Sequence, residues 1–452
     1  MSPKNLLALC RRFPGRTAAG GLLTLGMAWV AVATLNAEPT PRNEAAFLAR
    51  GQELFEHVWT VNDSWAAAGG DGLGPVFNAK SCVACHFQGG VGGSGPVKNN
   101  VMSFVAQPVK GRTTVVEGVI HTASLSDELL QSRADVHNLY PIRPPTRREI
   151  APGCWITTPA HDPVVALEVS TPALFGVGLI ASIPESAIVW NELQQQSSQV
   201  GDELRGQFLK SASGRVRKLK SGEIGRFGWK AQFSSLKKFV ATACAVETGL
   251  SNSIRNQDCP TSFCPDEHAK LDLSDEQVDQ LWSYCASLPR PEQILPADPV
   301  ALQEVRHGEQ LFSRIGCASC HTPSLGGVDG LYSDLLLHVI EPLPQEGGGY
   351  GDEPEVPLPD DFPLHEEWKS TPLWGVADTA PYFHDGRSPT LESAILRHAG
   401  EGKAAMQAYR KLQPEERAAL IAFLNSLKLP RSAKPVPTPP QSESPLVAGS
   451  QR

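Results

Sequence analysis

The stretch Ser81–Gly90 reads SCVACHFQGG and contains the pattern Cys-x-x-Cys-His. The same pattern returns near the C-terminal end as CASCH, at Cys317–His321. The segments that approach the two patterns are also alike, since Gly51–Phe55 (GQELF) resembles Gly308–Phe312 (GEQLF). The chain therefore contains two related modules, each built around one of these patterns.

Three further segments recur in the same order after each pattern. Ser170–Val177 of the first module matches Ser370–Val376 of the second, and Glu185–Ile188 matches Glu392–Ile395. Likewise, Leu273–Leu288 matches Leu412–Leu427. The last pair aligns without gaps, and its apolar residues recur at helical spacing. The shared order predicts helix, Cys-x-x-Cys-His, an S-T-P segment, an E-S-A-I helix and a closing helix in both modules.

The context of the cysteine pairs favours one chemistry among several. A four-cysteine zinc site is disfavoured because the pairs lie far apart and His follows each pair directly. A thioredoxin-type pair would need a β-α-β context, which the sequence lacks. Cys-x-x-Cys-His instead indicates covalent haem, with the imidazole on the iron. We expect two haem c groups, attached at Cys82, Cys85, Cys317 and Cys320, with His86 and His321 as proximal iron ligands.

The expected fold is mainly α, with two cytochrome c-like haem domains, long loops, and insertions that enlarge the first domain. We place the domains at 40–292 and 301–430, joined by the proline-rich linker PRPEQILPADP. Strand-like alternation is sparse, and 112–120 is a short candidate. The tail 431–452 is rich in proline and serine, so we expect disorder there.

The C-terminal module has a candidate for a second iron ligand. Leu391, Ala394, Ile395 and His398 fall on one face of an expected helix, which Gly400 can end. A histidine on an apolar face is often a hydrogen-bonded core residue. With an iron expected nearby, we interpret His398 as the distal ligand of the C-terminal haem.

The N-terminal module differs at this point. When the two Glu-Ser-Ala-Ile segments are aligned, Asn191 stands at the place of His398, and Asn is a poor ligand for haem iron. His121, His137 and His161 are other candidates, although none lies on a clear amphipathic face. The iron of this module is thus either open or water-bound, or it is ligated by one of these histidines or another residue.

The N-terminus has the features of an export signal. Basic residues precede the apolar run Ala18–Leu35, and Ala37 is a plausible cleavage site. Residues 1–37 are either a cleaved signal or a retained anchor, and only the anchor would give a membrane contact. In both cases we expect a periplasmic or otherwise exported protein.

The charge of the chain restricts its partners. The formal net charge is −8, and it becomes −12 without residues 1–37, which carry four basic and no acidic side chains. This balance disfavours nucleic acid and anionic membrane as partners. It suits docking of a basic electron-transfer protein, or simply a solvated acidic surface.

Five cysteines lie outside the haem motifs and the N-terminal segment, at positions 154, 244, 259, 264 and 285. An exported chain can oxidise such thiols. Cys259 and Cys264 close a short loop and are the pair we favour. Because five is odd, at least one thiol stays free or pairs elsewhere.

Several of these motifs together resemble a known family. The two Cys-x-x-Cys-His motifs, TPALFGVGLIASIPE, GRFGWKAQFSSLK and STPLWGVADTAPYFHDGRSPTLESAILRH are similar to the bacterial di-haem oxidoreductases, also labelled thiol oxidoreductases. This family is related to the di-haem cytochrome c peroxidases. The resemblance spans roughly residues 44–430 of this chain. In the peroxidases a distal Met follows an FHDG-type motif by fourteen residues. His398 occupies that position here, and bis-His ligation would lower the haem potential.

The resemblance implies a division of labour between the haems. The C-terminal haem would accept electrons from a small soluble carrier, a cytochrome or a cupredoxin, and the N-terminal haem would react with hydrogen peroxide. The peroxidase distal-histidine loop and catalytic glutamate have no match in context. Glu185 is the nearest acidic candidate, although a helix N-terminus also favours an acidic residue there.

Further side chains could serve the haems, each with a structural alternative. Trp155, Trp190 and Trp229 could relay electrons or simply pack. Arg226 and Arg387 could pair with haem propionates or remain solvated.

Three functions are compatible with the sequence. The first is an exported di-haem oxidoreductase of peroxidase type. The second is an electron-transfer cytochrome with both irons fully ligated and no substrate. The third is a haem-based sensor, which an attached signalling domain would favour.

Overall fold

The computed structural model describes residues 43–107, 116–130, 132–204, 213–258, 270–341, 361, 363 and 366–433. All of them fall in one compact unit that begins at Asn43. The predicted export segment 1–37, the pair Cys259 and Cys264, and the tail from 434 onward lie outside these residues. The domain boundaries at 292 and 301 remain predictions.

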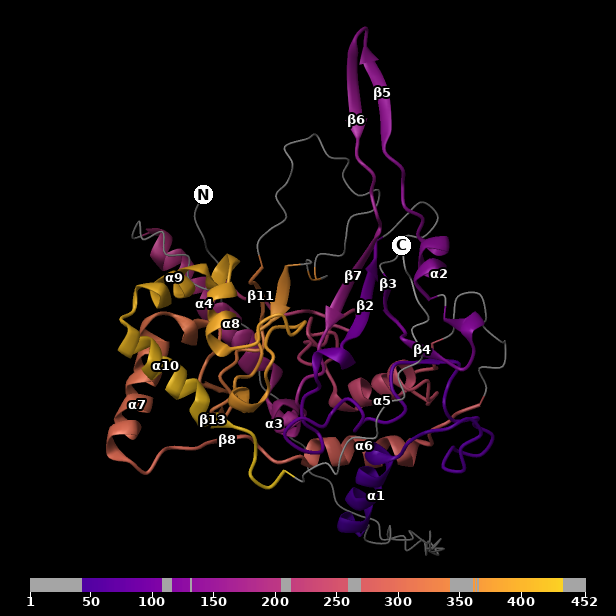
Figure 1. Ribbon diagram of the computed structural model, residues 1–452, viewed down its shortest axis with the longest axis horizontal. Coiled ribbons are helices and arrows are strands. Elements are labelled where there is room, and N and C mark those ends of the chain that lie inside the picture. The colour runs from indigo at the N-terminus through magenta and orange to yellow at the C-terminus, as the bar shows by residue number, and fades with distance from the viewer. Residues whose placement is uncertain are drawn as a thin grey trace, which may run out of the picture. The chain divides into compact units, whose positions relative to one another are not determined.

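Two crossed helix pairs support the Cys-x-x-Cys-His motifs (Figure 1). Helix α1 (Glu44–Glu56) packs on α6 (Asp275–Ser287), and α7 (Pro299–Arg314) packs on α10 (Pro414–Ser426). Both crossings are closest at a glycine of the first helix. A Cβ atom at Gly51 would lie 2.1 Å from the Gln280 carbonyl oxygen, and one at Gly308 would lie 1.9 Å from that of Ala419. The matching glycines of GQELF and GEQLF therefore allow the helix backbones to touch.

The two closing helices form where the sequence predicts them. Helix α6 begins with a capping box, in which Ser274 and Gln277 each accept a bond from the other's backbone N–H. Helix α10 begins with Pro414, whose ring suits the first turn. The remaining α-helices of the described part are α2 (Ser132–Leu139), α3 (Val177–Ser182), α4 (Glu185–Leu204), α5 (Leu236–Glu247), α8 (Leu391–Arg397) and α9 (Lys403–Lys411).

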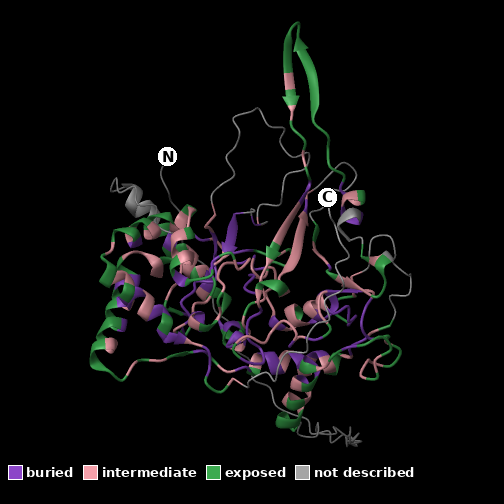
Figure 2. Ribbon diagram, in the orientation of Figure 1, coloured by how far each residue is buried: buried purple, intermediate pink, exposed green. Residues whose placement is uncertain are grey.

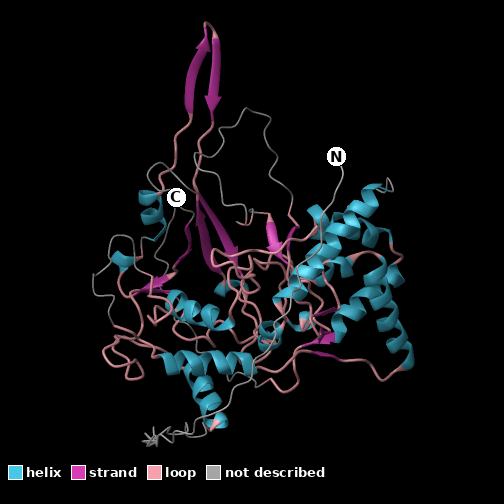
Figure 3. Ribbon diagram, turned by 180° about the vertical axis from the view of Figure 1, so that it is seen from behind, coloured by secondary structure: helices cyan, strands magenta, loops and turns pink. Residues whose placement is uncertain are grey.

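The fold is mixed helix and sheet, so the expectation of a mainly α protein needs correction (Figure 3). A three-stranded antiparallel sheet has the order β3 (Val116–Ile120), β2 (Val101–Ala106), β7 (Val164–Val169). Segments such as VMSFVA and VVALEV are short apolar runs, and periodicity alone cannot assign such runs to strands. The candidate 112–120 is confirmed in part, because β3 covers its second half and residues 112–115 are not described.

The insertion also contains a two-stranded ribbon, β5 (Thr146–Ala151) and β6 (Cys154–Thr158), which projects from the three-stranded sheet (Figure 1). The other described strands are short paired segments. They are β1 (Val76–Phe77) with β4 (Ala123–Ser124), β9 (Ser324–Leu325) with β10 (Val328–Asp329), β11 (Leu337–Val339) with β12 (Glu367–Lys369), and β8 (Glu292–Gln293) with β13 (Leu427–Lys428).

The buried apolar residues form three main clusters, and two of them adjoin the motifs. Cys82 packs against a cluster built on α1, α5 and α6, and Cys317 packs against one built on α7 and α10. A third cluster joins α3 and α5 to the segment that follows the second motif. Each motif therefore lies at the edge of its own core.

Candidate haem sites

The N-terminal motif is a single turn that presents its two cysteines and its histidine together. The His86 N–H donates to the Cys82 carbonyl at 2.9 Å. The His86 ring nitrogen Nδ1 lies 3.2 Å from the Gly93 carbonyl oxygen. Only an N–H can bond a carbonyl, so Nδ1 carries the proton, and in the neutral ring Nε2 is the unprotonated nitrogen. Burial lowers the pKa of His86 to about 4, which keeps the ring neutral as a metal requires.

The C-terminal motif repeats this geometry. The His321 N–H donates to the Cys317 carbonyl at 3.0 Å, and Nδ1 bonds the Tyr332 carbonyl at 3.1 Å. Burial lowers the pKa of His321 to about 4 as well. Cys320 is part of this turn, and burial raises the pKa of its thiol. Both motifs thus offer a neutral imidazole beside two partly buried sulfurs, a donor set that fits a haem.

His398 lies opposite His321. It is the C-cap residue directly after α8, its ring centre is 6.5 Å from that of His321, and its Nδ1 bonds the Ala394 carbonyl at 2.9 Å. Two imidazoles on one metal have ring centres roughly 6 Å apart, from metal–nitrogen bonds of about 2 Å on each side. The spacing of the two rings fits a bis-His iron, and the role of His398 as a ligand stays a prediction.

The structural counterpart of α8 in the first module is α5, whereas the sequence alignment pointed to α4. The turns before the two helices match. In the first turn an isolated β-bridge joins Phe227 to Phe233, and residues 228 and 231 have positive φ. In the second turn a β-bridge joins Tyr382 to Ser388, and residues 383 and 386 have positive φ. Both helices are then capped by a hydroxyl, of Ser235 in α5 and Thr390 in α8.

This correspondence places Ala243 at the position of His398. Counting from the caps, Ala243 and His398 are both the eighth residue after the hydroxyl. An alanine cannot bind a metal, so the N-terminal module has no side-chain ligand at the place where the C-terminal module has His398. Asn191, the residue aligned from the Glu-Ser-Ala-Ile segments, lies on α4 and is not the counterpart.

Sequence reasoning missed Glu247, which lies four residues after Ala243 on the same face of α5. Its carboxylate accepts a bond from Asn78 Nδ2 at 2.7 Å, and it lies close enough to raise the pKa of the Cys85 thiol. Burial raises the pKa of Glu247 to about 7, against the bond from Asn78, which lowers it. The pairing of FGWKAQFSSL with YFHDGRSPTL was the signal that could have found this helix.

Glu185, the predicted catalytic candidate, is engaged elsewhere. Its side chain is 46% exposed at the start of α4, accepts a bond from the Ile224 N–H at 3.2 Å, and lies 3.7 Å from the Arg226 guanidinium. These contacts match the alternative of an acidic residue at a helix N-terminus. Arg226 also donates to the Ile183 carbonyl, and Arg387 pairs with Glu341 at 2.8 Å.

The three candidate histidines of the first module have protein partners. His121 is buried and its Nε2 bonds the Val246 carbonyl of α5 at 2.8 Å. His137 lies 3.2 Å from Asp162 on the surface, and His161 forms a backbone bridge with Arg143 at the base of the ribbon. His121 alone therefore approaches the helix that faces the first motif.

The three candidate tryptophans differ in their exposure and in their contacts. Trp155 and Trp190 are 50% and 63% exposed. Trp229 lies between the modules, where its Nε1 donates to the Ser170 carbonyl at 2.9 Å and its own carbonyl accepts from the Lys369 N–H at 3.0 Å. It therefore contacts the S-T-P segment of the first module and the strand β12, which directly precedes that of the second. His384 lies beside it at 6.5 Å and stacks on Trp368 at 3.5 Å between ring centres.

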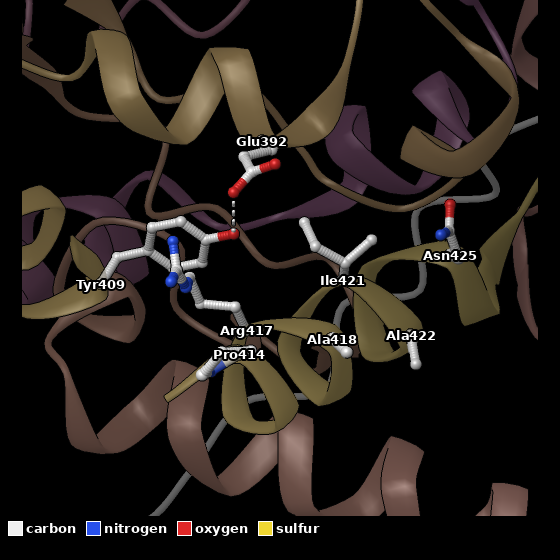
Figure 4. Close-up of a pocket in the computed structure, with 8 residues that line it drawn as sticks. All are labelled: Glu392, Tyr409, Pro414, Arg417, Ala418, Ile421, Ala422 and Asn425. Carbon is white, nitrogen blue, oxygen red and sulfur yellow. Dashed lines mark hydrogen bonds between the residues drawn. The ribbon is translucent and has the colours of Figure 1, made fainter. Parts of the chain in front are cut away.

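The surface hollow in Figure 4 is separate from the two motifs. It has a volume of about 480 Å³ and lies between α8, α9 and α10, with Tyr409 donating to Glu392 at 3.2 Å. Neither Cys-x-x-Cys-His motif lines it. Among the described residues, no helix has both the length and the apolar character needed to cross a bilayer.

The fold and the two motif sites define a protein with two haem-binding modules. A family model described as "Di-haem oxidoreductase, putative peroxidase" matches residues 160–427, which is more than half of the chain. The chain belongs to this di-haem oxidoreductase family.

One curated relative is the cytochrome c551 peroxidase of Nitrosomonas europaea, 30% identical over 135 residues. The match covers 29% of this chain and 37% of the relative's length. Two solved structures are similar at low scores. The hydrazine synthase of Kuenenia stuttgartiensis has 13% identity and a TM-score of 0.40, covering 91% of this chain and all of that one. A MauG-like protein associated with microbial copper homeostasis has 19% identity and a TM-score of 0.27, covering 49% and 80%.

Proposed function

We propose that this protein is an exported di-haem c-type oxidoreductase that reduces hydrogen peroxide or another small oxidant. The haems would be attached at Cys82 and Cys85 and at Cys317 and Cys320, with His86, His321 and His398 as iron ligands. Haem, when bound, supplies a redox-active iron in each module. The peroxidase in the name of the Nitrosomonas relative supports this reaction class.

One observation carries the proposal, namely the unequal second faces of the two sites. His398 stands 6.5 Å from His321, which suits a closed site that only transfers electrons. The matching position in the first module is Ala243, which leaves room for a small oxidant. Catalysis needs such an accessible position, whereas electron transfer does not.

Glu247 is the acid–base group of this site in our proposal. It lies one helical turn from Ala243, and a carboxyl with a pKa of about 7 can both take and return a proton near neutrality. Asn78 fixes the orientation of the carboxylate through the 2.7 Å bond. Glu185 lacks comparable contacts with the first motif.

The C-terminal module would receive electrons from a small soluble protein, a cytochrome or a cupredoxin, in the periplasm. Trp229 would then lie on the path to the N-terminal module, because it contacts Ser170 of the first module and Lys369 of the second. The negative charge of the chain favours a basic donor.

The absorption and electron paramagnetic resonance spectra of the oxidised protein test the proposal. We expect one low-spin and one high-spin haem, with the high-spin signal sensitive to cyanide. His398→Ala should make the low-spin haem high-spin. Ala243→His should make the high-spin haem low-spin and abolish turnover with peroxide. Two low-spin haems in the unaltered protein, neither of which admits cyanide, would exclude the proposal.

The alternative is a di-haem electron-transfer cytochrome without a substrate. His121 favours it, because this buried histidine approaches α5 and could ligate the first iron after a local rearrangement. In that case His121→Ala, and not Ala243→His, would change the spin state of the N-terminal haem.

A further inference from the structure

The last turn of α5, which carries Glu247, lies within the fold. Apart from Lys238, every residue of this helix is buried or half-buried (Figure 2). The backbone N–H groups of Asn78 and Ala79 both donate to the Glu247 carbonyl, at 2.8 and 3.1 Å. These two bonds satisfy a carbonyl that has no partner within the helix. The Asn78 side chain is therefore not needed as a cap, and its bond at 2.7 Å serves the Glu247 carboxylate alone.

The Asn78 amide can present only its nitrogen to Glu247. The Thr122 backbone N–H lies 2.9 Å from one end of this amide, and the Thr122 hydroxyl lies 3.2 Å from the same atom. Because a backbone N–H can only donate, that atom is the oxygen Oδ1. The end that faces Glu247 must then be Nδ2, so Thr122 keeps Asn78 a donor to the carboxylate.

His121, the residue before Thr122, holds the same turn of α5. It is buried, and its Nε2 donates to the Val246 carbonyl at 2.8 Å. Burial lowers the pKa of His121, which keeps the ring neutral with its proton on Nε2. Both residues have a fixed place, because they lie between β3 and β4, and β4 pairs with the strand β1 that directly precedes Asn78.

We infer that His121 and Thr122 are positioning residues for Glu247, an inference that rests on the acid–base role of Glu247 in the proposed function. Together they form a brace, in which His121 holds the helix backbone and Thr122 orients Asn78. Asn78 binds only the carboxylate oxygen Oε2. Within the described part of the chain Oε1 has no hydrogen bond, so the brace leaves this oxygen to exchange a proton with the substrate.

The groups around Glu247 show what the brace contributes. Burial raises the pKa of Glu247 to about 7, donation from Asn78 lowers it, and the charge of Asp258 raises it. Burial also raises the pKa of the nearby Cys85 thiol, and the charge of Glu247 raises it further. Donation from Asn78 is thus the contact among these that favours the carboxylate. Loss of this donation should raise the pKa of Glu247 above about 7.

Infrared difference spectroscopy of the full-length holoprotein across a pH series tests the brace without any turnover. The band of the protonated Glu247 carboxyl is identified by its absence from Glu247→Gln, and its midpoint gives the pKa. His121→Ala and Asn78→Leu should each raise this midpoint by about one pH unit, because each withdraws the Asn78 donor from the carboxylate. Thr122→Val should raise it by less, since the backbone N–H of residue 122 remains.

Conservative variants are the matched controls. His121→Gln keeps an N–H donor for the Val246 carbonyl and Thr122→Ser keeps the hydroxyl, so both should hold the midpoint within about 0.3 pH units of the unaltered protein. A midpoint that stays near 7 in both His121→Ala and Asn78→Leu, in proteins with an unchanged far-ultraviolet circular dichroism spectrum, would overturn the inference.

Two further measurements separate the brace from the proposed function. The pH at which peroxide turnover rises should move with the infrared midpoint. If the midpoint moves and the turnover profile does not, the brace stands and Glu247 is not the base of the reaction. A changed spin state of the N-terminal haem in His121→Ala would make His121 an iron ligand and would overturn the brace.

Discussion

Three imidazoles at the proposed haem sites are oriented in the same way. His86, His321 and His398 each direct Nδ1 at a backbone carbonyl, at 3.2, 3.1 and 2.9 Å. Because the carbonyl holds the proton on Nδ1, the other nitrogen must present its lone pair. The backbone therefore prepares each ring as a ligand before any metal arrives.

Glu247→Gln should lower turnover with peroxide about 10²- to 10³-fold, because the amide cannot exchange a proton with the substrate. In the unaltered protein the carboxylate is the base, so the rate should rise as the pH passes about 7, the pKa of Glu247. Glu247→Gln should remove this rise. Glu185→Gln is the control and should retain turnover within about twofold, as expected for a solvated side chain. An unchanged pH profile in Glu247→Gln would refute the acid–base role.

A buried charge network lies against the C-terminal motif. His338 is 1% exposed and bonds Asp334 and Glu401, each at 2.9 Å, while its ring also contacts the Cys320 sulfur at 3.5 Å. Burial alone would lower the pKa of His338, but the charge of Asp334 outweighs it and raises that pKa well above its usual range.

His338→Gln should reduce the free energy of unfolding by about 3–5 kcal/mol, because two buried carboxylates lose their cation. The histidine's contribution is complete below its unfolded pKa near 6.5 and declines as the pH rises through the higher folded pKa. The difference between the two proteins should therefore be larger at pH 6 than at pH 9 in urea unfolding. His137→Gln, which removes a partner of the exposed Asp162, should cost no more than about 1 kcal/mol. A His338→Gln cost that grows toward pH 9 would contradict this account.

At the scale of elements, each module is built on two helices that cross in close contact. Gly51 in α1 and Gly308 in α7 leave no room for a Cβ atom against α6 and α10. The second motif follows directly after α7. The first lies farther along the chain from α1 and is tied to it by the bond from the Val83 N–H to the Phe55 carbonyl at 3.2 Å. The glycine that GQELF and GEQLF share is thus needed for the packing of the helices.

Gly308→Ala should lower the free energy of unfolding by about 1–3 kcal/mol, since the added methyl forces the two backbones apart. Gln303→Ala, at an exposed position of the same helix, should change it by less than about 0.5 kcal/mol. Thermal unfolding of both variants measures the difference. Equal stability of the two would show that the crossing can relax.

At the scale of the whole molecule, each module bonds the backbone of the other at the start of its S-T-P segment or just before it. The turn before α5 binds the strand before Ser370 through the Trp229 carbonyl, and the turn before α8 binds Ser170 through the His384 carbonyl at 2.5 Å. The reciprocal bonds bring Trp229, His384 and Trp368 together between the modules.

Trp229→Leu should slow electron transfer from the C-terminal to the N-terminal haem, because it removes the aromatic ring that bonds Ser170 of the first module and lies beside His384 of the second. Stopped-flow absorption after reduction of the C-terminal haem measures this rate directly. Trp190→Leu, at a tryptophan that is 63% exposed, should leave it unchanged. Equal rates in the two variants would remove Trp229 from the path.

Much of the architecture could be predicted, and the failures have physical causes. The closing helices α6 and α10 were found because their apolar residues keep a helical period. The sheet of β2, β3 and β7 was missed because short apolar runs have no distinctive period. The counterpart of α8 was misplaced because Glu-Ser-Ala-Ile is the stronger likeness in letters, whereas the turn before α5 is alike only in backbone geometry.

The sequence by itself predicts where the haems attach and which imidazoles serve them, His398 included. Cys-x-x-Cys-His is a local pattern, and its chemistry follows from five consecutive residues. Only the tertiary structure decided which residue of the first module corresponds to His398, because that depends on segments about a hundred residues or more away. It placed Ala243 at that position, with Glu247 on the same helix, and it set the ring of His398 6.5 Å from that of His321. The inequality of the two sites is a property of packing, and the motifs alone do not encode it.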